Sequence, residues 1–163
     1  MFLVFCCADF NANTIIAKSK TAMLKFPSVT KYMATQLITF QPDTFIWEAI
    51  DVILKKKISG APLLNAEGEL VGMLSEVDCL RILVDSAYND EPLQMLRVAD
   101  FMSVSVITIR ADQTIFDAAN LFLHSWLKRL PVIEKGKVVG QISRVDVLKA
   151  VQDMKPAARH IPD

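Results

Sequence analysis

Hydrophobic residues recur along this chain at two characteristic spacings, and the same order of spacings occurs twice. One segment in each half has apolar residues at the i, i+3, i+4, i+7 and i+8 positions of an amphipathic helix, at 46, 49, 50, 53 and 54 and at 115, 118, 119, 122 and 123. Two short apolar runs around a glycine-containing turn follow in each half, at 61–64 and 70–74 and at 130–133 and 138–142. Such runs predict an antiparallel β-hairpin.

Each half is completed by a short apolar run before the first helix and by a helix after the hairpin. The run contains Thr39 in the first half and Thr108 in the second, and β-branched residues of this kind are typical of a strand. The closing helices carry apolar stripes, at Val77, Leu80 and Val84 and at Val145, Leu148 and Val151. The order strand, helix, strand, strand, helix predicts an α+β fold built from two β-α-β-β-α units.

The two halves form an internal repeat. Matched residues lie 69 positions apart before the hairpin turn, as in Thr39 with Thr108 and Pro62 with Pro131, and 68 apart after it, as in Gly72 with Gly140, Ser75 with Ser143 and Asp78 with Asp146. A one-residue deletion confined to a glycine turn is what a duplicated unit tolerates. We expect an N-terminal extension at 1–27, a first repeat at 28–87, a linker at 88–97, a second repeat at 98–154 and a tail at 155–163.

A Ser-x-x-Asp motif joins the last strand to the last helix of each repeat, Ser75 with Asp78 and Ser143 with Asp146. One interpretation is structural, because serine caps a helix and an acid three residues later completes a capping box. The other is ligand binding. A helix N-terminus offers free N–H groups to a phosphate, and a fixed carboxylate accepts hydrogen bonds from both hydroxyls of a ribose. The capping role holds under either interpretation.

Composition excludes several classes of function. The 163 residues include 18 basic and 18 acidic side chains, so net charge gives no argument for binding nucleic acid or an anionic membrane. No apolar run approaches the roughly 20 residues that span a bilayer, and the run at 2–8 lacks the preceding positive charge of a signal peptide. Three cysteines, two of them adjacent, form neither a disulfide framework nor a metal-ligand pattern. We expect a cytoplasmic protein with no metal, no required cofactor and, since no nucleophile elbow, P-loop or acid pair is present, no enzymatic activity.

The order of these motifs resembles the cystathionine-β-synthase (CBS) domain pair, or Bateman module, over residues 29–154. Each lead-in ending in methionine is followed by a threonine strand, a helix, an apolar-proline strand, a glycine strand and Ser-x-x-Asp. The resemblance implies two repeats related by pseudo-twofold symmetry, with two small sheets back to back and helices outside. It also implies a stand-alone, bacterial-type CBS-domain protein, because no catalytic or transport domain flanks the pair.

The resemblance further implies two clefts that bind adenine nucleotides or adenosyl compounds (AMP, ADP, ATP or S-adenosylmethionine). One cleft would combine Ser143, Arg144 and Asp146 with Ile38, Thr39, Ile58, Ser59 and Gly60, and the other Ser75 and Asp78 with Ile107, Thr108, Leu127, Lys128 and Arg129. The backbone at Ile38 and Ile107 is the candidate for contacting an adenine edge, whereas the two threonine side chains are also explained as plain strand residues. Gly60 would let a ligand approach the backbone.

The clefts are expected to differ. Arg144, beside the capping serine, is positioned to reach a phosphate, although a solvated arginine explains it equally well; its counterpart Glu76 would repel one unless Lys128 and Arg129 offset it. We therefore expect tighter binding in the Ser143 cleft. A ligand there would change the angle between repeats or protomers for a regulated partner still unknown. The alternative is a ligand-free interaction module.

A second apolar face predicts a homodimer. Its residues are Trp47, Val52, Phe116, Leu121 and Trp126, which lie off the helical core stripes, and two pairs of them repeat at the 69-residue offset.

Overall fold

The computed structural model of the protein describes residues 26–86 and 95–154. The predicted tail, most of the N-terminal extension and most of the linker lie outside these residues. No helix among the described residues is long and apolar enough to cross a membrane.

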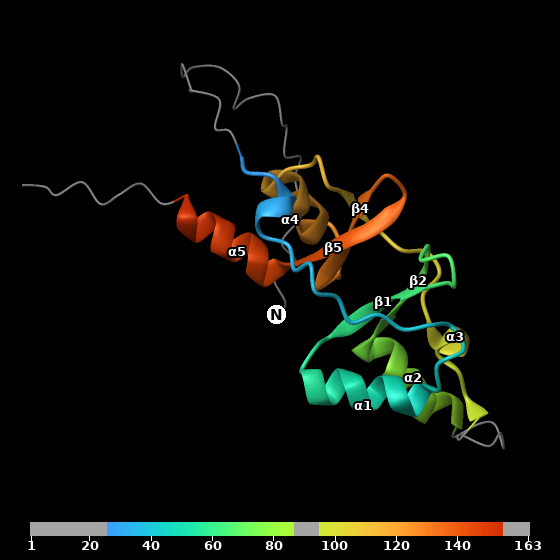
Figure 1. Ribbon diagram of the computed structural model, residues 1–163. Helices are drawn as coiled ribbons and strands as arrows, with labels where there is room; N and C mark the ends of the chain where they lie inside the picture. Colours follow the sequence, from blue (N-terminus) through green and yellow to red (C-terminus); the bar gives the residue numbers. More distant parts are fainter. Residues whose placement is uncertain (1–25, 87–94, 155–163) are drawn as a thin grey trace, which may run out of the picture.

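Both repeats have the expected hairpin and the expected two helices. The first contains α1 (Ile46–Lys56), β1 (Gly60–Leu64), β2 (Leu70–Ser75) and α2 (Glu76–Ser86). The second contains β3 (Ile109–Arg110), α4 (Ile115–Leu123), β4 (Arg129–Glu134), β5 (Lys137–Ser143) and α5 (Arg144–Asp153), and the lead-ins form η1 (Val29–Lys31) and α3 (Val98–Phe101). The hairpins β1–β2 and β4–β5 are antiparallel, as predicted. In Figure 1 these four strands lie in the middle of the molecule, with α1 and α2 on one side and α4 and α5 on the other.

The threonine-containing runs give unequal strands. In the second repeat, β3 pairs in parallel with β4 and completes a three-stranded sheet. In the first repeat the equivalent pairing shrinks to one bridge between Phe40 and Leu63, so β1 and β2 form a two-stranded sheet. The backbone N–H of Phe40 still donates to Pro62 O at 3.1 Å, which keeps this segment beside the hairpin.

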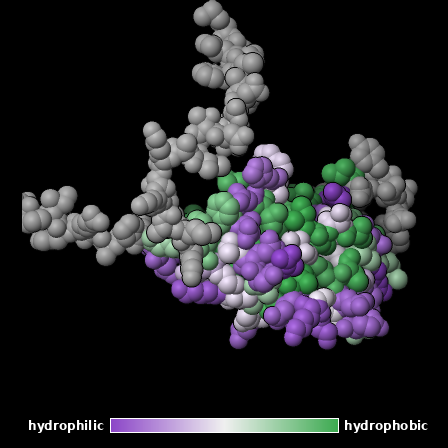
Figure 2. Space-filling view, turned by 90° about the horizontal axis from the view of Figure 1, so that it is seen from above, coloured by the Kyte–Doolittle hydropathy of each residue, from purple (hydrophilic) through white to green (hydrophobic). Residues whose placement is uncertain are grey.

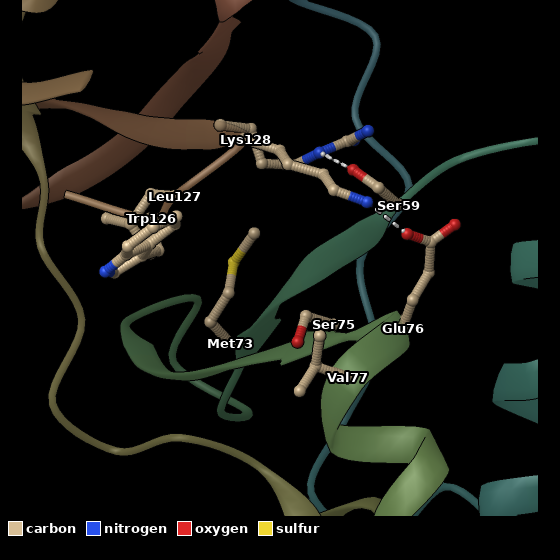
Figure 3. A pocket seen from close by; sticks show the side chains of 9 residues that line it. Ser59, Met73, Ser75, Glu76, Val77, Trp126, Leu127 and Lys128 are labelled. Atoms are coloured by element: carbon tan, nitrogen blue, oxygen red, sulfur yellow. Dashed lines mark hydrogen bonds and ion pairs between the residues drawn. The ribbon is translucent and has the colours of Figure 1, made fainter. Parts of the chain in front are cut away.

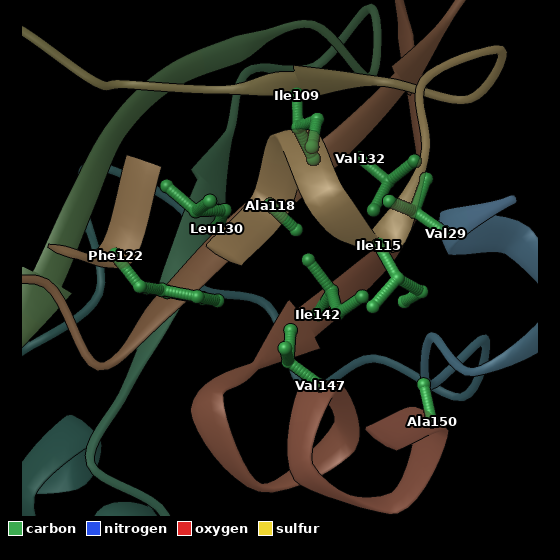
Figure 4. Close-up of a cluster of buried hydrophobic side chains, with 10 residues drawn as sticks. All are labelled: Val29, Ile109, Ile115, Ala118, Phe122, Leu130, Val132, Ile142, Val147 and Ala150. Atoms are coloured by element: carbon green, nitrogen blue, oxygen red, sulfur yellow. The ribbon is translucent and has the colours of Figure 1, made fainter. Parts of the chain in front are cut away.

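The lead-in of each repeat packs against the other repeat. Val29 is fully buried in the core of the second repeat, whereas Val98 is fully buried in that of the first. Figure 4 shows Val29, on the blue lead-in, facing Ile115 and Val132. Backbone bonds repeat the exchange, because Ala34 pairs with Gln141 on β5 and Ser103 with Met73 on β2, each at 2.9 Å in both directions. The two repeats are therefore tied together by their first residues.

Glycines make this exchange possible. A Cβ on Gly72 would lie 2.6 Å from Sδ of Met102, and one on Gly140 would meet Sδ of Met33. The methionine that ends each lead-in therefore occupies the space that a side chain on the glycine strand would need. Packing alone therefore explains why the repeated motif has a methionine at the end of the lead-in and a glycine in the strand.

The helical stripes are only partly buried. Ile46, Ala49 and Ile53 of α1 are buried as predicted, but Leu54 is 68% exposed, and its counterpart Leu123 on α4 is 80% exposed. The amphipathic pattern predicts that both leucines face the core, and this prediction is wrong, because the hairpin covers a narrower sector of each helix than the apolar residues span. The stripes of α2 and α5 are exposed throughout, at Val77, Leu80, Val84, Val145, Leu148 and Val151.

The exposed apolar face consists of residues that differ in part from those predicted. Val52 and Leu121 pack against the cores. The apolar residues left exposed on α1 and α4 include Trp47 and Phe116. Trp47 lines a hollow together with Leu80 of the exposed α2 stripe. Figure 2 shows a continuous hydrophobic area on one face of the molecule, bordered by hydrophilic residues. Helices that lie on one side of a sheet have a second face, and here no described residue covers it.

Candidate ligand cleft between the repeats

Ser75 and Asp78 form a closed hydrogen-bonded unit where β2 turns into α2. The backbone N–H and the Oγ of Ser75 both donate to Oδ2 of Asp78, at 2.8 and 2.6 Å. Ser103, from the exchanged lead-in, donates to the other carboxylate oxygen at 3.3 Å. Asp78 is 5% exposed, so these bonds fix the orientation of its carboxylate.

Ser143 and Asp146 form a capping box where β5 turns into α5. Oγ of Ser143 donates to Oδ2 of Asp146 at 2.6 Å, and Nζ of Lys149 donates to Oδ1 at 3.0 Å. Burial alone raises the pKa of Asp146, but the bonds from Ser143 and Lys149 outweigh it and hold the pKa below its ordinary value. The structural interpretation of the motif therefore holds at this junction, and the carboxylate is charged at neutral pH.

A cavity of about 240 Å³ lies between the two repeats on the Ser75 side. The first repeat lines it with Ser59, Met73, Ser75, Glu76 and Val77, and the second with Trp126, Leu127, Lys128 and Arg129. Figure 3 shows Trp126 and Leu127 across the opening from Val77, with Met73 between them and Lys128 reaching over to Glu76. The wall is apolar at one end and charged at the other.

A second hollow of about 150 Å³ continues the first. Both are lined by Met73, Ser75, Leu127 and Arg129, and the second adds Asp78, Ser103, Ser105, Val106, Ile107 and Pro131. The structure thus brings together most of the residues that the resemblance assigned to this cleft. Thr108 does not line either hollow.

Two cations from the second repeat reach across to the first. Nζ of Lys128 lies 2.8 Å from Oε2 of Glu76, in an ion pair whose side chains are 62% and 48% exposed. Arg129 donates from Nε to Oγ of Ser59 at 3.0 Å and from Nη1 to Gly60 O at 3.1 Å. Burial lowers the pKa of Arg129 from its ordinary value. Arginine keeps its charge in proteins, so a half-buried positive charge stands at the cleft wall.

The residues assigned to the Ser143 cleft are more dispersed. Arg144 turns back to its own repeat, where Nη2 donates to Ser125 O at 3.2 Å and the guanidinium carbon lies 6.0 Å from the centre of the Phe122 ring. Ile38 and Ile58 pack against the core of the first repeat, and Thr39 is exposed. Ser59 lines the Ser75-side cavity instead.

Gly60 has a packing reason for its small size. Its φ is 146°, a conformation that side chains rarely adopt, and a Cβ would meet the backbone oxygen of Leu74. The matching residue of the second repeat, Arg129, has a side chain that occupies the space between the two repeats. The close approach at Gly60 is therefore made by the protein's own β2 strand.

Three residues of the region were missed at the level of sequence. The repeated motifs do not single out Met73, and the sequence pattern predicts Trp126, which is 99% exposed, at the dimer face. Gln141 is 8% exposed; its Oε1 accepts from Arg129 at 3.4 Å, and its Nε2 has no partner among the described residues. For Trp126 a signal existed, since its counterpart at the 69-residue offset is Lys57, so it does not share the repeat's apolar pattern.

The family model described as CBS domain matches residues 29–85 and 98–153. The chain therefore belongs to the CBS-domain family, as its motifs indicated, and carries two such domains in tandem. Among solved structures, CBSX2 of Arabidopsis thaliana in complex with AMP is similar, with a TM-score of 0.69 and 28% identity over 80% of this chain and 99% of that one. The α+β fold of paired repeats is confirmed.

Curated relatives differ in length. Uncharacterized protein MJ1426 of Methanocaldococcus jannaschii is 30% identical over 150 residues, which cover 73% of this chain and 88% of that protein. Against several others the chain spans less than half of the longer protein. It is 30% identical over 136 residues to the A-adding tRNA nucleotidyltransferase of Aquifex aeolicus, covering 83% of this chain and 15% of the enzyme.

Proposed function

We propose that this chain is a regulatory module that binds an adenine nucleotide or an adenosyl compound between its two CBS repeats. The observation that carries the proposal is the Ser75-side cavity, whose wall joins a fixed Ser-x-x-Asp junction of one repeat to Lys128 and Arg129 of the other. The relative CBSX2, 28% identical, has been solved with AMP. The proposed role is regulatory and not catalytic, and the larger enzymes among the relatives contain this module as a minor part of their length.

The chemistry of the cavity suits the three parts of an adenosyl ligand. Met73, Val77 and Leu127 offer an apolar wall for a base. The carboxylate of Asp78, held by Ser75 and Ser103, keeps acceptor capacity for ribose hydroxyls. The first turn of α2 and the two cations supply positive potential for a phosphate.

Such a ligand would contact both repeats at once. Its binding can shift their relative arrangement only by as much as it prefers one arrangement over another. Because β1 and β4 approach each other through Arg129, Ser59 and Gly60, a change at the cleft reaches the strands that support all the outer helices. A partner protein that recognises those helices would detect the change.

Thermal unfolding of the purified chain with AMP, ADP, ATP and S-adenosylmethionine, each from micromolar to millimolar, tests the proposal. Binding to the native state raises the midpoint progressively with ligand concentration. The matched variants Asp78→Ala and Asp146→Ala both keep their capping serine, so each is compared with its own ligand-free midpoint. If only one variant loses the ligand-dependent rise of the midpoint, the cleft that contains the replaced aspartate is the occupied one. The absence of a shift with every ligand would overturn the proposal.

A second candidate function is an interaction module that needs no ligand. The observation that favours it is the exposed apolar stripe on α2 and on α5, which the two repeats present in matching form. Two matching faces on one chain suit an isologous contact with a second copy, so we propose a homodimer in either case. A dimer whose stability does not respond to any adenosyl ligand would favour this candidate.

A further inference from the structure

Arg129 is a half-buried cation that makes no direct ion pair among the described residues, although the carboxylates of Glu76 and Asp146 lie near enough to stabilise its charge. Among the described residues its side chain donates to neutral groups, Oγ of Ser59, the carbonyl of Gly60 and the side-chain oxygen of Gln141. A guanidinium that has lost part of its hydration is stabilised by an anion, and neutral acceptors supply only part of that stabilisation. Arg129 lines both hollows on the Ser75 side, where a ligand can reach it.

Lys128, the neighbouring cation, has an internal anion. Its ammonium pairs with Glu76, the first residue of α2, across the gap between the repeats. The pair is largely exposed, so it is weak and can exchange for another anion. Glu76 thus neutralises a cation that a ligand's phosphate would otherwise meet at this side of the cavity.

The other side of the pseudo-twofold axis lacks this arrangement. The positions that match Lys128 and Arg129 are Ser59 and Gly60, which carry no charge. Arg144, the one cation placed there by the sequence, is bonded to Ser125 O in its own repeat. Positive charge facing the space between the repeats is therefore concentrated on the Ser75 side.

We infer that the Ser75-side cavity is the site for the phosphate of a nucleotide, with Arg129 and Lys128 as its anion-binding pair and Glu76 as a built-in competitor. This inference rests on the proposed function and reverses the expectation that the Ser143 cleft binds more tightly. The charge of the cavity then predicts which adenosyl compounds bind well. Phosphorylated adenosines bind better than adenosine. S-adenosylmethionine has no phosphate, and its one anionic group is the carboxylate of its methionine part, so it gains less from the pair than a phosphate does.

The test compares AMP with adenosine by isothermal titration calorimetry on the full chain. Charge-assisted hydrogen bonds to a phosphate predict an affinity for AMP roughly ten- to a hundredfold above that for adenosine. Lys128→Met and Arg129→Met reduce this ratio, and Arg129→Lys, which keeps the charge, retains part of it. Glu76→Gln, at an exposed position, raises the affinity for AMP about two- to fivefold and leaves adenosine unchanged.

Arg144→Met is the matched control in the other repeat and leaves the ratio unchanged. If Arg144→Met abolishes the preference for AMP while the Lys128, Arg129 and Glu76 variants do not, the phosphate lies in the Ser143 cleft and the inference is wrong. Equal binding of AMP and adenosine in every variant also overturns it, although the proposed function stands. Binding of neither compound, nor of the other adenosyl ligands, would refute the proposed function itself.

Discussion

Met33 lies directly against Gly140, a residue of the other repeat's glycine strand, and its Sδ fills the space where a Cβ would stand. The same contact joins Met102 to Gly72. These two contacts, with the backbone bonds beside them, hold each lead-in on the partner repeat. Each packed unit therefore consists of the helices and hairpin of one repeat together with the lead-in of the other repeat.

Replacing Gly140 by alanine should loosen this exchange. The new Cβ would lie 2.9 Å from Cγ of Met33 and 3.0 Å from the backbone oxygen of Ala34, so the lead-in must move. Overpacking of this kind costs about 1–3 kcal/mol, measured as the free energy of unfolding in urea.

Met33→Ala provides the control for that change. The double variant Met33→Ala with Gly140→Ala should be more stable than the sum of the two single effects predicts, because the smaller side chain removes the clash. Strictly additive effects would show that the contact does not hold the lead-in.

The Ser143–Asp146 unit should make stability depend on acid. The pKa of Asp146 is lowered in the folded chain, so its contribution is complete above the unfolded carboxyl pKa of about 3.9 and is lost as the pH falls through the lower folded value. The difference in unfolding free energy between the native chain and Asp146→Asn should therefore shrink as the pH is lowered from about 6 to about 3.

Ser143→Ala separates the cap from the charge. It removes a helix cap and should cost about 1 kcal/mol near neutral pH. Because the Ser143 hydroxyl is one of the groups that lower the pKa of Asp146, this variant should also lose stability at a higher pH than the native chain. An Asp146→Asn difference that stays constant with pH would contradict this account.

Cys79 should react slowly with alkylating agents. It is a half-buried residue of α2 that lines a hollow shared with α1, and burial together with the carboxylates of Asp78 and Glu76 raises the pKa of its thiol to about 11. An unperturbed thiol has a pKa of about 8.5, so near pH 8 the thiolate fraction of Cys79 is roughly two-hundredfold lower.

The measurement is the rate of iodoacetamide labelling by mass spectrometry, in a chain whose Cys6 and Cys7 are replaced by serine. The urea-unfolded chain is the control and should be labelled at the ordinary rate. Equal rates in the folded and unfolded chain would show that the thiol is not shielded.

A charge on the exposed stripe should dissociate the proposed dimer. Leu148 is 65% and Leu80 62% exposed in the single chain, and an aspartate buried at a dimer contact without a partner is strongly destabilising. Leu148→Asp and Leu80→Asp should sediment as monomers at concentrations where the native chain is dimeric. Lys137→Glu, at the start of β5 away from the stripes, serves as the charge control. A native chain that is monomeric throughout would refute the dimer.

Local patterns predicted the elements and their order well. The hairpins were found because a tight turn fixes which strands pair, and Pro62 with Pro131 and Ser75 with Ser143 aligned the two copies. Helical periodicity identified the stripe of α2 and α5, but it could not say whether Leu80 faces a core or remains exposed. The answer depends on how much of each helix the sheet covers, and no local spacing contains that information.

The sequence by itself determined the duplication, the α+β class, the family and the two capped junctions, because each depends on residues within about one turn of each other or on direct comparison of the two copies. Only the tertiary structure decided that the lead-ins exchange, that Arg129 reaches Ser59 and Gly60 of the other repeat, and that Arg144 turns away from the cleft. These contacts join residues distant in sequence. A long side chain such as that of arginine donates to whichever acceptors lie within its reach. Those acceptors are in place only once the chain has folded and the two repeats have packed together.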